Sequence, residues 1–339
     1  MLDKIACSLF SSLIFSRGTF AASLLTLMNI VPSSQSIDYV RDKKQFHLYS
    51  LLTEQRHPKT YNLSYQIAQN TTIGLQALLE VDCDISIKLH EIASNPEQLK
   101  QLENASEAIQ SALLNGQKIY FYGTGSTGRL AKMVESSLWR LFWKKAKKIT
   151  KQSKVDKYLP DIENRLIGEI TGGDRALISS LEGFEDLQLI GKLQLQDNNI
   201  QKGDVVFALT EGGETSAVIG TILTAANLYK KPTQNLYFIY NNPDAVLLSF
   251  ERSRAVLENE HIQKINLTTG PQAIAGSTRM QATTISLYVS GIILEDAIYK
   301  VLQRYLSQSE LAELGFHESL TIKQQLLDFA MIQKTMGVI

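Results

Sequence analysis

Apolar residues recur in short runs from residue 118 onward, and each run is followed by a turn rich in Gly, Ser or Thr and then by a segment with helical spacing. The runs, of which the last is the weakest, are residues 119–122, 166–170, 205–209, 236–240 and 262–267. The intervening helices are expected to begin near Thr127, Asp174, Thr215 and Ala245. Such alternation predicts an α/β fold with a parallel five-stranded sheet covered by helices on both faces.

The segments on either side of these runs have helical spacing. Apolar positions between residues 63 and 114 predict two or three helices. We therefore expect a helical lead-in (51–115), an α/β domain (116–305) and a C-terminal helical segment (306–339). Basic residues between 144 and 164 predict a surface excursion whose lysines form a solvated face.

The first 50 residues form an N-terminal extension with two apolar runs, 5–15 and 20–31, which Arg17 and Pro32 interrupt. A bilayer-spanning helix needs about 20 consecutive apolar residues, and neither run reaches that length. A packed amphipathic helix or an upstream extension is the favoured interpretation. A signal or membrane role is the alternative that the sequence leaves open.

Overall composition narrows the classes of partner. The chain has 34 Lys and Arg against 34 Asp and Glu, a balance that argues against nucleic acid or an anionic membrane surface. Two cysteines outside any metal-type pair fit a reducing, cytoplasmic location. Five scattered histidines show no ligand spacing, so we expect neither a metal site nor a cofactor.

The turn after the first run, GTGSTGR at residues 123–129, combines glycines with two hydroxyl residues, Ser126 and Thr127. Free N–H groups and the dipole at a helix start attract an anion such as phosphate. The spacing also fits the Gly-x-Gly-x-x-Gly dinucleotide fingerprint, which expects an acidic residue about 20 positions later. That neighbourhood is KKAKK at residues 144–148, so the turn favours a phosphomonoester.

Later turns carry further candidate chemistry. TEGGETS at residues 210–216 suits an anion, yet Glu211 and Glu214 would repel phosphate unless they point away, pair with a cation or bind a sugar hydroxyl. GSTRM at residues 276–280 places small hydroxyls and an arginine at a helix start. Three carboxylates, including Glu185, follow the second run, a pattern typical of a solvated helix end.

Taken together, these turns resemble those of the N-acetylmuramic acid 6-phosphate etherases and the glucokinase regulatory proteins, which share the SIS (sugar isomerase) fold. The matching segments occur in the family's order and are residues 53–58, 123–130, 171–177, 182–186, 204–220, 242–243 and 270–280. The resemblance implies a SIS-type, flavodoxin-like sheet and a sugar-phosphate ligand held by two loops. The positions that it assigns to the ligand are Gly123, Gly125, Ser126, Thr127, Gly128, Thr210, Gly212, Gly213, Thr215 and Ser277.

The same resemblance assigns two catalytic glutamates to the etherases, which eliminate lactate from the sugar. One aligns with Glu185, the candidate catalytic residue, whereas Ser137 stands at the position of the other. Elimination needs a base and an acid, and a serine hydroxyl is a poor proton donor. Glu135 precedes Ser137 by two residues, about 200° around a helix, so we expect it to face elsewhere.

The chain is therefore predicted to be a sensor or regulator of a hexose or amino-sugar 6-phosphate. A divergent etherase or a sugar-phosphate isomerase with Glu185 as base is the enzymatic alternative, and an interaction protein with an emptied pocket is a third. The family's sites lie between two SIS units, so we expect a homodimer or one unit of a tandem chain. A protein partner such as a sugar kinase fits the regulator interpretation.

Overall fold

The computed structural model describes residues 29, 31–43, 47–150, 152–179, 181, 183–230, 234–316 and 321–336, in two units that divide between Leu48 and Tyr49. Within its described part, the first unit holds helix α3 (Ser34–Asp42), which Ser33 caps by accepting a hydrogen bond from the N–H of Ser36. Most of the N-terminal apolar sequence lies outside the described residues. The expected division into four segments remains a prediction.

Five parallel strands form the sheet of the second unit, in the order β2-β1-β3-β4-β5. They are β1 (Ile119–Gly123), β2 (Leu166–Ile170), β3 (Val205–Leu209), β4 (Leu236–Tyr240) and β5 (Gln263–Asn266). Ile119 of β1 lies opposite Leu166 on one side and Val205 on the other. The predicted α/β fold with its parallel sheet is confirmed.

Both faces of the sheet are buried, which explains why the strands are continuous apolar runs. Tyr120 and Tyr122 of β1 enter the core on one face, and Phe121 enters the core on the other. On that second face Phe121 stacks on Phe207 with ring centroids 4.5 Å apart, and Phe207 stacks on Tyr237 at 4.8 Å. This aromatic row ties β1, β3 and β4 together in register.

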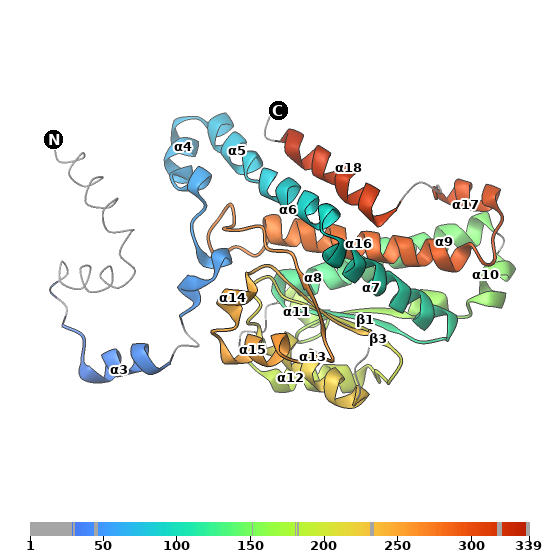
Figure 1. Ribbon diagram of the computed structural model, residues 1–339, viewed down its shortest axis with the longest axis horizontal. Helices are drawn as coiled ribbons and strands as arrows, with labels where there is room; N and C mark the ends of the chain where they lie inside the picture. Colours follow the sequence, from blue (N-terminus) through green and yellow to red (C-terminus); the bar gives the residue numbers. More distant parts are fainter. Residues whose placement is uncertain are drawn as a thin grey trace. The chain divides into compact units, whose positions relative to one another are not determined.

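Helices cover the two faces of this sheet, as Figure 1 shows. Helices α6 (Cys83–Ser94), α7 (Pro96–Leu114), α8 (Gly125–Met133), α9 (Arg140–Ile149), α16 (Gln281–Leu302) and α18 (Ile322–Thr335) contribute to the core on one face. Helices α12 (Gln188–Asp197), α13 (Ser216–Tyr229) and α15 (Glu251–Leu257) contribute to the core on the other.

Shorter elements complete the described chain. The remaining α-helices are α4 (Leu63–Gln69), α5 (Thr71–Glu80), α10 (Gln152–Tyr158), α11 (Arg175–Ile178), α14 (Asp244–Leu247) and α17 (Gln308–Leu314). Single turns of 3₁₀-helix are η2 (Leu48–Ser50), η3 (Leu52–Glu54), η4 (Pro58–Thr60) and η6 (Ile162–Asn164), and η5 (Val134–Trp139) is a π-helix. No helix in the described part of the chain is long and apolar enough to cross a membrane.

Residues 63–114 form four helices where the sequence predicted two or three. The extra breaks are made by asparagines that cap the helix after them. Asn70 accepts a hydrogen bond from the N–H of Thr72 at 2.8 Å, and Asn95 accepts one from the N–H of Glu97 at 3.0 Å. Asparagine is a preferred helix N-cap, so Asn70 and Asn95 each begin a new helix without interrupting the apolar spacing.

The basic segment from 144 to 164 is more than the expected surface excursion. Helix α9 buries Trp143 and Ala146 against the core, so this segment is part of the packed unit. Its Lys147 lies 2.8 Å from Asp156, which makes the lysine an ion-pair partner rather than a freely solvated charge. Lys144, Lys145 and Lys148 are exposed, as predicted for a solvated face, so only the packing of the segment against the core differs from the expectation.

The strand order fixes where a ligand site belongs. Because the chain passes from β1 outward to β2 and then returns to β3 on the other side, the order reverses between β1 and β3. In open parallel sheets a crevice forms beyond the carboxyl ends of the strands at this reversal. The β1–α8 and β3–α13 turns, both rich in glycine, flank that point.

Candidate sugar-phosphate site

The β1–α8 turn brings a helix start close to the sheet edge. A Cβ atom on Gly123 would lie 2.4 Å from the carbonyl carbon of Thr127, so glycine alone lets strand and helix approach this closely. The hydroxyl of Thr127 accepts a hydrogen bond from the N–H of Thr124 and donates one to its C=O. The first turn of α8 therefore presents the positive end of its dipole to the crevice.

Ser126 joins this turn to two distant parts of the chain. Its buried Oγ lies 3.1 Å from Oε1 of Glu211, in the β3–α13 turn, and 2.6 Å from Oγ1 of Thr278, in the segment before α16. Thr283, in the first turn of α16, also donates to Oε1 of Glu211, at 3.1 Å. The hydroxyls of Ser126 and Thr283 thus converge on the carboxyl group of Glu211, and Thr278 joins them through Ser126.

Glu211 is buried, with 4% of its surface exposed. Loss of solvation raises the pKa of its carboxyl group to about 7, and hydrogen bonds from its own backbone N–H, from Thr283 and from Ser126 oppose this rise only in part. No ion pair joins Glu211 to a cation within the described part of the chain. A titratable carboxyl with a perturbed pKa at a strand-end crevice is typical of a functional site.

Glu214, three residues later in the same turn, has the opposite environment. Arg252 lies 2.9 Å from its Oε2, and the N–H of Ser253 donates to its Oε1 at 2.9 Å. Glu214 therefore forms an ion pair with Arg252, whereas Glu211 is hydrogen-bonded by the hydroxyls of Ser126 and Thr283.

The β3–α13 turn is also closed by its own hydroxyls. Oγ1 of Thr210 lies 2.9 Å from Oγ1 of Thr215 and accepts a hydrogen bond from the N–H of Gly213 at 3.2 Å. Gly213 has a φ of 82°, a left-handed conformation that favours glycine. The neighbouring C=O of Gly212 accepts a hydrogen bond from Asn242 at 3.0 Å. These hydrogen bonds fix the backbone conformation of the turn.

Residues near Thr53 form a further wall of the site. The side chain of Asn242, after β4, donates to Oγ1 of Thr53 at 3.0 Å and accepts from the N–H of Leu52 at 2.7 Å. The C=O of Thr53 in turn accepts a hydrogen bond from the N–H of Gly276 at 3.1 Å. The lead-in is therefore tied to both the 210–216 turn and the segment before α16.

Glu185 and Ser277 lie beside this cluster without a side-chain contact to it among the described residues. The C=O of Glu185 accepts a hydrogen bond from the N–H of Ala217 at 2.9 Å, which places Glu185 at the start of α13. Its side chain is half-buried. Ser277 is also half-buried, and the neighbouring Thr278 makes the contact to Ser126.

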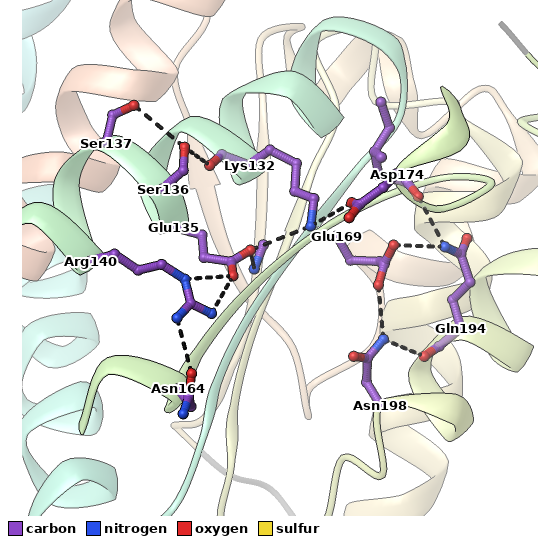
Figure 2. A network of polar contacts seen from close by, with 12 residues as sticks. Lys132, Glu135, Ser136, Ser137, Arg140, Asn164, Glu169, Asp174, Gln194 and Asn198 are labelled. Atoms are coloured by element: carbon purple, nitrogen blue, oxygen red, sulfur yellow. Dashed lines mark hydrogen bonds and ion pairs between the residues drawn. The ribbon is translucent and has the colours of Figure 1, made fainter. Parts of the chain in front are cut away.

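Ser137 belongs to a different surface. It lies in the π-helix η5, eleven residues after Ser126 along one helical stretch, a rise of about 16 Å. Its exposed side chain borders a largely apolar cavity of about 550 Å³ formed with residues of α9, α16 and α17. In Figure 2 its hydroxyl points toward that of Ser136, at 3.4 Å.

Glu135 faces away from Ser137, as expected from its position on the helix (Figure 2). Arg140 binds its Oε1 at 2.8 Å, and Lys132 lies 3.4 Å from its Oε2. The N–H of Gly168 in β2 donates to the same Oε2 at 3.1 Å. Glu135 therefore holds η5 against β2 and does not take the place of the missing glutamate.

No group of three or more His, Cys, Asp or Glu side chains converges to hold a metal ion in the part of the chain that the structure describes. The polar lining of the crevice consists of hydroxyls, amides and carboxyl groups, which suit hydrogen bonding to an oxygen-rich ligand.

The sequence patterns missed four members of this lining. Thr278, Thr283, Asn242 and Thr53 were not assigned to the site, and the role of Glu211 was left open. Thr53, Asn242 and Thr278 all fall within segments that carried the family resemblance, so a signal existed for them. Thr283 belongs to an ordinary helix turn, and its sequence context gives no such signal.

The fold and its crevice define a SIS-type α/β protein with a polar site between the β1 and β3 turns. The family model described as "Glucokinase regulatory protein N-terminal SIS domain" matches residues 101–226. The chain is also similar to N-acetylmuramic acid 6-phosphate etherases. The enzyme of Petrotoga mobilis is 29% identical over 73% of this chain and 69% of its own length. N-acetylmuramic acid 6-phosphate etherase 1 of Bacillus licheniformis is 27% identical over 75% of this chain and 71% of its own. By these matches and by its fold, the chain is similar to SIS-domain proteins of the glucokinase regulatory protein and N-acetylmuramic acid 6-phosphate etherase type.

Proposed function

We propose that this protein binds a hexose or amino-sugar 6-phosphate and acts as a sensor or regulator. The phosphate lies at the start of α8, with Ser126 and the 210–215 turn around it. Glu185 and Ser277, at the rim, contact sugar hydroxyls. The observation that carries this proposal is the meeting of Ser126, Glu211 and Thr278 at the point where the strand order reverses.

A sensor is favoured over a lyase because one proton-transfer group is missing. Ser137 has no acidic side chain, and its exposed position borders a cavity apart from the Ser126 cluster. Glu135 is held by Arg140 and Lys132. Loss of one such group typically costs about 10²- to 10⁴-fold in rate.

A divergent etherase is the second candidate, and two observations favour it. The similar curated proteins are etherases, and Glu185 lies at the start of α13 beside the 210–216 turn. A residual lyase would use Glu185 as the base at the carbon next to the carbonyl.

We also propose that a second SIS unit completes the ligand's site. We propose a homodimer as the source of that unit, and a sugar kinase as the kind of protein partner that a regulator would contact.

Proton NMR with N-acetylmuramic acid 6-phosphate tests the proposal. We expect saturation transfer from the protein to the sugar and no lactate methyl signal above that of a Glu185→Ala control over one day. Lactate above the control would make the protein an etherase. If neither this ligand nor hexose and amino-sugar 6-phosphates give saturation transfer or raise the melting temperature, the binding function is wrong.

A Ser137→Glu variant distinguishes an etherase site that has lost only its second glutamate from a site whose geometry has also changed. We expect it to release no lactate, because residue 137 lies about 16 Å along the helix from Ser126. Lactate release by this variant would instead favour a degenerate etherase.

A further inference from the structure

The carboxyl group of Glu211 occupies the part of the crevice where the proposed function puts phosphate. Its Oε1 lies 3.1 Å from Oγ of Ser126, whose backbone belongs to the first turn of α8. An ionised carboxyl group beside a phosphate would be strongly unfavourable in a buried site, because like charges repel most where water is excluded. A phosphate ligand therefore requires that this charge be removed.

No cationic side chain among the described residues forms an ion pair that would neutralise Glu211. The elements around Glu211 are its own turn, α8, the end of β4 with α14, the segment leading into α16, and η3 of the lead-in with the residues after it. Their charged residues nearest the site are Arg129, Lys132, Glu214, Asp244 and Arg279, together with Glu54 and Arg56, which are both exposed.

Each of the other five has an environment away from Glu211. Arg129 donates to the carbonyls of Leu177 and Ala176, and Lys132 pairs with Asp174 and Glu135. Glu214 pairs with Arg252, and Asp244 accepts from Tyr240 and Asn266. Arg279 is exposed. A proton is the remaining means of neutralising Glu211.

Burial already favours the protonated form, since the pKa of this carboxyl group is raised to about 7. Oε1 accepts a hydrogen bond from Ser126 and lies 3.1 Å from Oγ1 of Thr283, whose hydroxyl also donates to the C=O of Thr278, so these contacts are compatible with a protonated carboxyl group. A carboxylic acid kept neutral by burial is a good hydrogen-bond donor to an oxyanion.

We propose that Glu211 is a ligand-binding residue that acts in its neutral form, donating a hydrogen bond from its carboxyl O–H to an oxygen of the ligand's anionic group. This assignment rests on the proposed sugar-phosphate function. Binding then takes up a proton whenever Glu211 is ionised in the free protein. The affinity for the ligand therefore falls as the pH rises.

Two isosteric probes isolate the proton on the protein: N-acetylglucosamine 6-phosphate and N-acetylglucosamine 6-sulfate. The phosphate is almost entirely dianionic above pH 7, and the sulfate ester does not titrate, so a pH dependence in this range arises from the protein. Calorimetric titration of the wild type from pH 7 to 9 should show affinity falling about tenfold per pH unit for each probe that binds. Heats measured at pH 8 in two buffers of different ionisation enthalpy should show uptake of about one proton.

The Glu211→Gln variant keeps the shape of the side chain and removes the titration. Its affinity should be independent of pH between 7 and 9, and at pH 9 it should bind more tightly than the wild type. Glu251→Gln, an exposed carboxyl at the start of α15, is the matched control and should behave as the wild type.

The outcomes distinguish the two proposals. Binding by the wild type without proton uptake, or an unchanged pH dependence in Glu211→Gln, would overturn the role of Glu211 while leaving sugar-phosphate binding intact. Absence of binding of these probes, of N-acetylmuramic acid 6-phosphate and of hexose 6-phosphates by the wild type, the control and Glu211→Gln alike, at pH 7 as well as pH 9, would overturn the proposed function itself, and this assignment with it. The buffer comparison on the wild type requires no variant, so a failure of Glu211→Gln to fold does not remove the test.

Discussion

Glu211 and Glu214 lie in one turn and are both almost completely buried, yet they play different parts. Arg252 neutralises Glu214, so that residue stabilises the turn as half of an ion pair. Glu211 has no cation partner among the described residues and is hydrogen-bonded by the hydroxyls of Ser126 and Thr283 and by its own backbone N–H. The difference arises from what packs against each side chain and not from the residue type.

The raised pKa of Glu211 makes the stability of the protein depend on pH. The carboxyl ordinarily titrates near 4.5, and in the folded protein its pKa is raised to about 7. The folded state therefore keeps a proton that the unfolded state has lost, so the contribution to stability is full below pH 4.5 and is lost as the pH rises through 7. Between pH 5 and 8 the free energy of unfolding of the wild type should fall by about 2–3 kcal/mol more than that of Glu211→Gln.

Urea unfolding of both proteins at pH 5 and pH 8 measures this difference. Titration of other groups affects the two proteins alike and cancels in the comparison. Equal losses in the two proteins would show that Glu211 titrates normally.

At the residue scale the sequence predicted the glycines and hydroxyls of the turns, because short turns between buried strands and helices need those residue types. It did not predict which glutamate would be left without a cation. That outcome depends on Thr283 and Arg252, which lie 72 and 38 residues away along the chain from their partners. Contacts between residues so far apart in the chain cannot be predicted from the local sequence.

The β1–α8 junction is the element on which the site depends most. Gly123→Ala would place a Cβ atom 2.4 Å from the carbonyl carbon of Thr127, in contact with backbone that cannot move aside cheaply. We expect this variant to lose about 2 kcal/mol or more of stability and to weaken sugar-phosphate binding. Gly291→Ala is the control, because Gly291 lies in α16 outside the site and its Cβ position has only an ordinary contact, with Cδ1 of Leu138 at 3.9 Å. Thermal unfolding with and without ligand measures both effects, and equal behaviour of the two variants would contradict the prediction.

The π-helix η5 is expected to be held to the sheet by Glu135. Glu135→Ala removes the contacts to Arg140, Lys132 and the N–H of Gly168, and leaves that N–H without its partner. The expected loss of unfolding free energy is about 1–3 kcal/mol. Ser136→Ala, on the exposed side of the same turn, should cost less than about 0.5 kcal/mol. Chemical denaturation of the two variants decides whether the carboxyl group has this role.

At the element scale the strands were the most predictable part. Parallel strands buried on both faces must be apolar throughout, so their bounds follow from the sequence to within a residue or so. Helix number in 63–114 was less clear, since Asn70 and Asn95 end and restart helices without breaking the apolar spacing. The π-helix η5 has no sequence signature at all.

For the whole molecule we expect a dimer. Each chain has a mass of 37.9 kDa, so light scattering after gel filtration should give about twice that value. Met133, Leu138 and Leu141 lie exposed along α8, η5 and α9, an apolar surface that a second chain would cover. A protein that binds sugar phosphate as a strict monomer would contradict this expectation.

The contacts of Asn242 and Thr53 have a consequence for the modularity of the site. Thr53 and Thr278 both line the crevice, and both lie outside the segment 101–226 that matches the family model. An excised fragment with those boundaries would keep the turns that follow β1 and β3 but would lose Thr53 and Thr278. Under the proposed function, the segment needed for ligand recognition therefore extends from about residue 50 to the first turns of α16, and recombination inside that stretch would separate residues that contact one another.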